Sequence, residues 1–349
     1  MLRSLFHAWE HHLASVTKDR VVRPFEWGLD WIPVNGHPPG AGEADVIGHW
    51  VDGVMADTDA FFTPPPCDAF EVTAAVDGEQ HVAFPSALQT PHPANNIVRC
   101  RYFPTRAPGR RAAVVVLPQW NADPGGHVGL CRLLAWSGMS ALRLSLPYHD
   151  ERMPPELHRA DYIVSANVAR TVQVCRQAVL DARRAIGWLA AQGYERIGIL
   201  GTSLGSCLSM LTTAHEPLVR AEALNHISPY FADVVWRGLS TRHVRAGLDS
   251  HIDLDRLREL WKPISPRWYL DRLRDRRTLL VYARYDLTFP VDLSQDLVRE
   301  FAERGVPHEV AVLSCGHYST GKAPFKFVDG WVLTRFLRRA LLDDPAASG

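Results

Sequence analysis

The chain has 349 residues, of which 46% are hydrophobic and 22% are charged, as in an ordinary globular protein. Its formal net charge at pH 7 is zero, so we expect no binding to nucleic acid or to an acidic surface. The six cysteines form no Cys-x-x-Cys pair and are expected to be reduced thiols in the core. The N-terminus lacks the apolar core of a signal peptide, and no stretch is long enough to cross a membrane. We therefore expect a cytoplasmic protein without an integral membrane segment.

The first 95 residues are expected to form a helix and an irregular extension that pack on a larger domain. Residues 1–20 are predicted to be helical, because their apolar side chains recur on one stripe. The polar face of this helix is not strongly basic, which favours packing on its own chain over contact with a membrane. Residues 21–95 are rich in proline and glycine, as in His37-Pro38-Pro39-Gly40, and within them Phe70–Val76 alternates enough to be a strand.

Residues 96–349 are expected to form the main domain, because strands and helices alternate along them. The predicted strands are Ile97–Phe103, Ala112–Leu117, Ala141–Leu146, Ile197–Leu200, Ala221–Ile227, Thr278–Ala283 and His308–Leu313. The predicted helices are His127–Trp136, residues 162–191, a helix from Leu204, Leu293–Ala302 and Val328–Leu342. This rhythm predicts an α/β fold, in which a mostly parallel sheet carries helices on both faces. Residues 229–276 are far longer than an ordinary connection and are expected to form a helical lid.

The sharpest motif is Gly-x-Ser-x-Gly at Gly201, Ser203 and Gly205, between a predicted strand and a predicted helix. A serine at the apex of such a turn needs a strained backbone and small neighbours. Its hydroxyl then stands at the positive end of the following helix. The alternative is a serine that merely caps the helix. The context favours a nucleophilic serine.

A serine nucleophile needs a base that takes its proton. A histidine and an aspartate follow the carboxyl ends of later predicted strands, where reactive groups gather in a parallel sheet. Asp286 follows the predicted strand Thr278–Ala283, and His317 follows His308–Leu313. We predict that His317 accepts the serine proton and that Asp286 orients its imidazole. Asp292 and Asp296 are weaker acid candidates because they lie inside the next helix. His149, His215 and His226 are expected to be structural or to contact substrate.

The order Ser203, Asp286, His317 resembles that of the α/β-hydrolase superfamily, and the chain is similar to a bacterial branch of its serine esterases and lipases. The resemblance implies an acyl-enzyme mechanism, with the backbone N–H of Leu204 as one oxyanion donor. The family's frequent His-Gly-x oxyanion loop is replaced here by Pro118-Gln119-Trp120-Asn121. We expect the second donor to be Trp120 N–H, with Gln119 and Asn121 as alternatives.

The predicted substrate is a small-molecule carboxylic ester. Apolar walls for it are expected from the lid and from the loop after Leu146, and the candidate residues are Tyr148, Trp236, Trp261 and Trp268, beside Gln119 and Asn121. Thioesterase, amidase or acyltransferase chemistry on the same triad remains open, as does a non-catalytic binding protein with this fold.

The sequence contains three partial cofactor or metal motifs, and each lacks a residue that binding requires. Gly316–Lys322 has the spacing of a phosphate-binding loop, but Ala323 stands where a Mg²⁺-binding hydroxyl is required. Pro124 replaces the first glycine of a dinucleotide fingerprint around Gly126 and Gly129. His308-Glu309 is not followed by a second zinc histidine. We therefore expect no cofactor and no metal.

Overall fold

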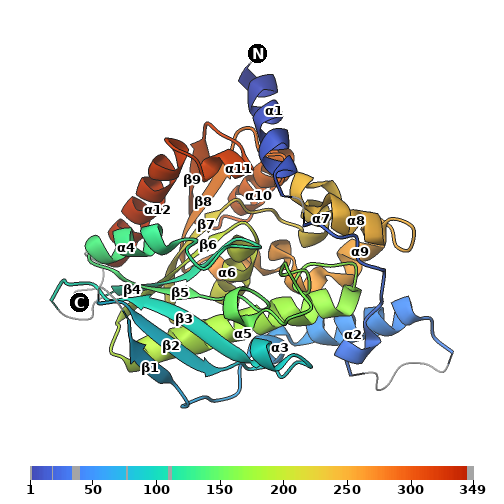
Figure 1. The fold of residues 1–349 in the computed structure, drawn as a ribbon, viewed down its shortest axis with the longest axis horizontal. Helices are drawn as coiled ribbons and strands as arrows, with labels where there is room; N and C mark the ends of the chain where they lie inside the picture. Colours follow the sequence, from blue (N-terminus) through green and yellow to red (C-terminus); the bar gives the residue numbers. More distant parts are fainter. Residues whose placement is uncertain (1, 18, 34–39, 76–77, 109–111, 344–349) are drawn as a thin grey trace.

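The computed structural model describes residues 2–17, 19–33, 40–75, 78–108 and 112–343. Nine described strands form one sheet in the order β1-β2-β3-β5-β4-β6-β7-β8-β9 (Figure 1). The strands are β1 Glu71–Ala74, β2 Gln80–Pro85, β3 Ile97–Phe103, β4 Ala112–Leu117, β5 Ser140–Leu144, β6 Arg196–Thr202, β7 Val219–Asn225, β8 Arg277–Ala283 and β9 His308–Leu313. The strands β5, β4, β6, β7, β8 and β9 pair in parallel, in that order across the sheet. The strands β1, β2 and β3 pair antiparallel with their neighbours. The expected α/β class and mostly parallel sheet are confirmed.

The centre of the sheet is apolar on both faces because helices cover both. Every residue of β4 is buried, as a central parallel strand requires. On one face lie α5 Val168–Ala191, α6 Leu204–His215 and α10 Val291–Glu303. On the other lie α4 Val128–Trp136 and α12 Phe325–Leu341 (Figure 1).

The N-terminal region contains more regular structure than the sequence predicts. It holds α1 Leu2–Ser15, α2 Glu43–Ala56 and α3 Thr58–Phe62 before the first two strands. The expectation of an irregular segment over 21–95 is corrected here, because α2 buries a helical stripe of Val46, Ile47, Val51 and Val54. The sheet also runs through the expected boundary at residue 95, since β2 pairs with both β1 and β3. Val76 and residues 37–39 lie outside the described residues.

The expected lid segment is helical. It contains α7 Phe231–Arg237, α8 Arg242–Leu248, α9 Leu254–Leu260 and the 3-10 helix η7 Pro266–Leu273. The short helix α11 His317–Thr320 follows β9, and further 3-10 turns are Leu29–Trp31, Pro93–Asn96, Asp150–Arg152, Leu239–Thr241 and Lys262–Ile264. None of the described helices has the length and apolar character needed to cross a membrane.

A buried acid in β7 makes the stability of the fold depend on pH. Glu222 is fully buried, and its Oε1 accepts a hydrogen bond of 2.9 Å from the Thr278 hydroxyl in β8. Burial raises the pKa of Glu222 to about 8 from its ordinary 4.5, against the lowering effect of hydrogen bonds from Thr213 and Thr278. Between these two values the folded protein holds a proton that the unfolded chain has lost, so stability falls as pH rises.

We predict that Glu222→Gln removes most of this pH dependence. The free energy of unfolding of the unchanged protein should fall between pH 5 and 8 by up to about 1.4 kcal/mol per unit from this group, and the variant should lack that slope. Denaturant unfolding across this pH range measures the difference. Glu195→Gln, at an exposed position, is the matched control and should leave the slope unchanged. Equal slopes in both variants would contradict the prediction.

Candidate active site

Ser203 stands at a strained turn between β6 and α6. Its φ of 57° and ψ of −119° lie outside the regions that ordinary residues favour, and its N–H donates to Asn225 O at 2.7 Å. The two glycines of the motif permit the turn because the chain passes close to itself. A Cβ on Gly201 would lie 2.1 Å from Gly205 O, and one on Gly205 would lie 2.1 Å from Leu117 O. The motif's glycines are therefore required by close backbone approach.

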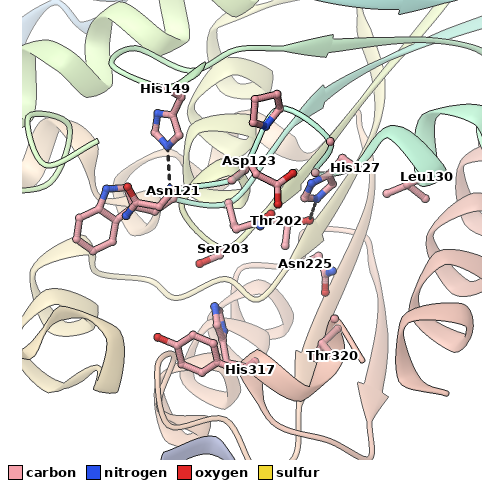
Figure 2. Close-up of a pocket in the computed structure, with 18 of the residues that line it drawn as sticks. Asn121, Asp123, His127, Leu130, His149, Thr202, Ser203, Asn225, His317 and Thr320 are labelled. Carbon is pink, nitrogen blue, oxygen red and sulfur yellow. Dashed lines mark hydrogen bonds between the residues drawn. The ribbon is translucent and has the colours of Figure 1, made fainter. Parts of the chain in front are cut away.

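Asp286 and His317 are brought together by β8 and β9, which are neighbours in the sheet. His317 Nδ1 lies 3.0 Å from Asp286 Oδ2, and Asp286 Oδ1 accepts backbone N–H groups of Thr288 and Phe289 at 2.8 and 2.7 Å. His317 also lines the cavity that Ser203 lines, and a ring nitrogen of His317 is directed toward that serine (Figure 2). A hydroxyl, an imidazole and a carboxylate thus come together at one cavity, and these are the groups that can activate a serine for nucleophilic attack.

The charges of the pair follow from its surroundings. Burial alone would raise the pKa of Asp286, but the charge of His317 and the hydrogen bonds from His226 and His317 hold it well below its ordinary value. Burial would lower the pKa of His317, whereas the charge and hydrogen bond of Asp286, with a smaller contribution from Glu10, raise it overall. The carboxylate is therefore ionised at neutral pH, and a proton on His317 is stabilised.

A second histidine shares the carboxylate, which the sequence did not predict. His226 directly follows β7, is 1% exposed, and places Nδ1 2.9 Å from the same Asp286 Oδ2 that His317 contacts. An ionised carboxylate accepts hydrogen bonds only, so both imidazoles present N–H groups to it. The ligand atoms of these three side chains lie within 4.8 Å of one another, as in a metal site. Because each imidazole can donate an N–H to Oδ2, we interpret the three side chains as a hydrogen-bonded cluster.

Glu10 in α1 is a further residue that the sequence did not predict. It is fully buried, and its carboxylate accepts the N–H groups of Tyr318 and Ser319 at 2.8 and 2.9 Å. These N–H groups lie in the first turn of α11, the helix that begins at His317, where they have no acceptor within the helix. A carboxylate is favourable at the N-terminal end of a helix. A Cβ on Gly316 would lie within 2.6 Å of three Glu10 side-chain atoms, so a larger residue before the histidine would displace the Glu10 carboxylate. The N-terminal helix therefore holds the histidine loop.

The loop after β4 carries the candidate oxyanion donors. The N–H of Asn121 donates to His149 Nε2 at 2.9 Å, so Asn121 is not a free donor. Within the described chain, the N–H groups of Trp120 and of Leu204, the first residue of α6, have no hydrogen-bond acceptor. The Trp120 indole is fixed by a 2.9 Å hydrogen bond to Ala160 O and stacks on His243. Leu204 and Trp120 thus stay the candidate donors, while Gln119 lines the cavity.

Two cavities meet at Ser203. The larger has a volume of about 1480 Å³ and is lined by Ser203, His317, Gln119 and the loop from Asn121 to His127 (Figure 2). The smaller has a volume of about 50 Å³ and a mainly apolar lining, which includes Leu204 and Cys207 of α6, Phe231, Val234 and Val235 of the lid, and Phe289 of the turn after β8. Trp120 and Ser203 line both.

Four expected substrate residues lie elsewhere. Trp261 is fully buried and donates its indole N–H to Val168 O, and Tyr148 is fully buried with its hydroxyl 3.1 Å from His92 Nδ1. Trp268 is 46% exposed beneath Lys262, and Trp236 packs beneath Arg245. None of these four side chains lines either cavity. The expectation that these four residues contact substrate is corrected. The apolar stripes of the lid pack against the protein core, and other residues of α7 line the cavity at Ser203 instead.

The remaining titratable candidates are structural. Asp292 pairs with Arg237 at 2.7 Å on the surface, and Asp296 pairs with Arg299 one turn along α10. His215 donates its Nδ1–H to Leu211 O, and His149 Nε2 holds the loop after β4 by accepting the N–H of Asn121. None of Asp292, Asp296 and His215 lines the described cavities.

Comparison with known proteins agrees with this architecture. Neither a protein-family model nor a curated protein sequence matches the chain. Among solved structures, the acetyl xylan esterase from Paenibacillus sp. R4 is similar with a TM-score of 0.61 and 14% identity, over 89% of this chain and 98% of that one. The acylaminoacyl peptidase of Pyrococcus horikoshii is similar with a TM-score of 0.60 and 14% identity, over 81% of this chain.

A puromycin-hydrolyzing peptidase of Mycobacterium tuberculosis is also similar, with a TM-score of 0.58 and 14% identity over 80% of this chain. The chain spans 43% and 46% of the lengths of the two peptidases. At these identities the likeness concerns the fold, and it confirms the α/β-hydrolase fold that the order of serine, acid and histidine predicts.

We predict that substitutions of Glu10 and of His226 shift the pKa of His317 in opposite directions. Glu10→Gln removes a negative charge that raises this pKa, so the pKa should fall. His226→Asn removes an N–H that competes for Asp286 Oδ2, so the pKa should rise; asparagine tolerates the backbone φ of 59° at this position.

Titration of the imidazole signals by NMR measures both shifts. Glu156→Gln, whose carboxylate pairs with His92, is the control and should leave His317 unchanged. A shift of the same sign in both variants would refute the assigned roles.

Proposed function

We propose that the protein is a serine hydrolase that cleaves a carboxylic ester of a short acyl chain through an acyl-enzyme. The observation that carries the proposal is Ser203 on its strained turn, in one cavity with His317, whose Nδ1 is hydrogen-bonded to Asp286. A non-catalytic protein has no physical need to hold this strained serine against a charged histidine–carboxylate pair. The solved structures of similar fold include esterases and peptidases, which supports hydrolysis.

The chemistry is two acyl transfers. Ser203 Oγ attacks the ester carbonyl carbon while His317 Nε2 takes the hydroxyl proton, and Asp286 stabilises the imidazolium. The carbonyl oxygen becomes an oxyanion that accepts the N–H groups of Leu204 and Trp120. Collapse of the intermediate breaks the bond to the alcohol oxygen, which receives the proton from His317. Water then repeats the sequence on the acyl-serine, giving the acid and free Ser203.

The smaller cavity favours an ester of a short acid. A volume of about 50 Å³ with an apolar lining holds a small alkyl group, whereas the acyl part of a peptide carries a side chain and a further amide. We therefore propose that this cavity takes the acyl chain and that the larger one takes the leaving group. The single proposed substrate class is a small-molecule ester with a short acyl chain.

Covalent labelling tests the nucleophile. A fluorophosphonate probe should label the protein at Ser203, and Ser203→Ala should lose both the label and the hydrolysis of ethyl acetate. Ser209→Ala is the matched control, since this serine lies in α6 but lines neither cavity. Labelling at another residue, or none in folded protein, would reject the serine mechanism. A parallel panel of an acetate ester, an acetyl thioester and an acetyl anilide should show the ester as the best substrate.

Enlarging the acyl cavity should change chain-length preference. Val234→Ala removes two methyl groups from the cavity lining, so the ratio of kcat/KM for ethyl butyrate over ethyl acetate should rise roughly tenfold or more. Val244→Ala is the matched control, because Val244 lies in the same lid segment but lines neither cavity. An unchanged ratio in Val234→Ala would place the acyl chain elsewhere.

A further inference from the structure

The larger cavity extends from Ser203 into a polar recess that the proposed chemistry does not use. We define the recess by His127, Thr202, Asn225, Thr320 and Asp329, all of which line the same cavity as Ser203 and His317. Figure 2 shows His127, Thr202, Asn225 and Thr320 grouped to one side of Ser203. The recess lies between the ends of β6 and β7 and the helices α4 and α12.

The recess contains polar atoms that the protein leaves without partners. Asn225 Nδ2 donates to Asp329 Oδ2 at 3.0 Å, but Asn225 Oδ1 and Asp329 Oδ1 are buried and have no hydrogen bond within the described chain. His127 Nε2 lies 2.9 Å from the Thr202 hydroxyl, and His127 Nδ1 is likewise buried without a partner. Asn225 is only 1% exposed. Buried polar atoms ordinarily have partners, so these three imply that a ligand or water supplies them.

The recess is built in advance of any ligand. His127 ends the loop from Asn121 with a φ of 67°, a conformation that costs energy in a residue other than glycine. The buried Arg143 guanidinium holds that loop by donating to the carbonyls of Gly126 and Asp123, the latter at 2.9 Å. A charged side chain that is 2% exposed thus fixes the wall of the recess.

The electrostatics of the recess suit a neutral ligand. Burial and, to a smaller extent, the charge of Arg143 lower the pKa of His127 to about 4, so this imidazole is neutral at pH 7. Burial raises the pKa of Asp329 to about 7, against the Asn225 hydrogen bond. The five side chains therefore hold no fixed positive charge for a phosphate or a carboxylate. The Arg143 charge behind the loop is paired with Asp150 at 2.9 Å, so it adds no net charge to the recess.

We propose that the polar recess binds the hydroxyl groups of a polyhydroxylated, carbohydrate-like alcohol, which is the leaving group of the ester. This proposal rests on the proposed function, because it assigns the leaving-group side of the same site. Hydroxyl groups both donate and accept, so they satisfy Asn225 Oδ1, His127 Nδ1 and the Asp329 carboxyl in either protonation state. The small apolar cavity and the polar recess of the larger one then match the two halves of one substrate.

The first test compares two acetate esters that differ in the alcohol. The unchanged protein should have a higher kcat/KM for mono-O-acetylglucose than for ethyl acetate. Asp329→Ala should lower the ratio of these two constants roughly tenfold, since the lost partner is buried. Asp329→Asn, which keeps the oxygen that accepts from Asn225, should lower it less. Thr334→Val on the same helix lines neither cavity and should leave the ratio unchanged.

The results of this test distinguish a failure of the recess proposal from a failure of the proposed hydrolase function. Hydrolysis of ethyl acetate with a ratio that Asp329→Ala does not change means that the recess holds water only, which overturns this proposal and leaves the hydrolase standing. If Asp329→Ala instead impairs acetylcholine hydrolysis selectively, the ligand is a cation and the polyol is rejected.

A binding measurement covers the case in which no ester is cleaved. Methyl glucoside titrated calorimetrically into Ser203→Ala should bind, and the additional change Asp329→Ala should weaken binding roughly tenfold. Absence of binding to Ser203→Ala overturns the recess proposal independently of any hydrolysis.

Discussion

One buried carboxylate organises this site. Asp286 accepts four hydrogen bonds, two from backbone N–H groups and two from the imidazoles of His226 and His317. A charge removed from water is tolerated only when its lone pairs are satisfied in this way. Satisfying Asp286 fixes the turn after β8, the orientation of His317 and the placement of His226 together. The hydrogen bonds of Asp286 therefore hold both histidines and the turn after β8 in place at the cavity.

The parallel strands of the sheet bring the partners of Asp286 to one place. β6, β7, β8 and β9 are neighbours in parallel, and their carboxyl ends deliver Ser203, His226, Asp286 and His317 in that order. The described residues other than glycine with positive φ are Asn121, His127, Tyr148, Asp150, Ser203 and His226. All of them follow the ends of β4, β5, β6 and β7. Backbone strain is thus concentrated at one edge of the sheet, where the cavity lies.

The sequence predicted what is local and missed what depends on distant packing. The strand, turn and helix around Ser203 could be predicted because Gly201 and Gly205 mark a close approach within five residues. Asp286 and His317 could be placed at strand ends, because the apolar runs before them are unambiguous. His226 also follows a predicted strand, but only the three-dimensional pairing of β7 with β8 reveals that it shares Asp286.

Other differences have the same origin. An apolar stripe predicts that Trp261 is buried, but it does not say whether the buried surface is a substrate wall or a core, and here it is a core. The proline-rich composition of residues 21–95 concealed α2, whose helical stripe is stabilised by tertiary contacts. Nothing near Glu10 in the sequence indicates its role, because its partners are contributed by the other end of the chain.

The contact between Glu10 and the histidine loop has a consequence for biosynthesis. Its partners Tyr318 and Ser319 lie 308 and 309 residues further along the chain. During translation, α1 therefore leaves the ribosome long before the backbone groups that its carboxylate will bind. The sheet strands up to β8 can pair first, while the segment that carries His317 is still being made. The ribosome thus releases Ser203 early and His317 late, so a nascent chain carries the serine before the histidine that we propose as its base.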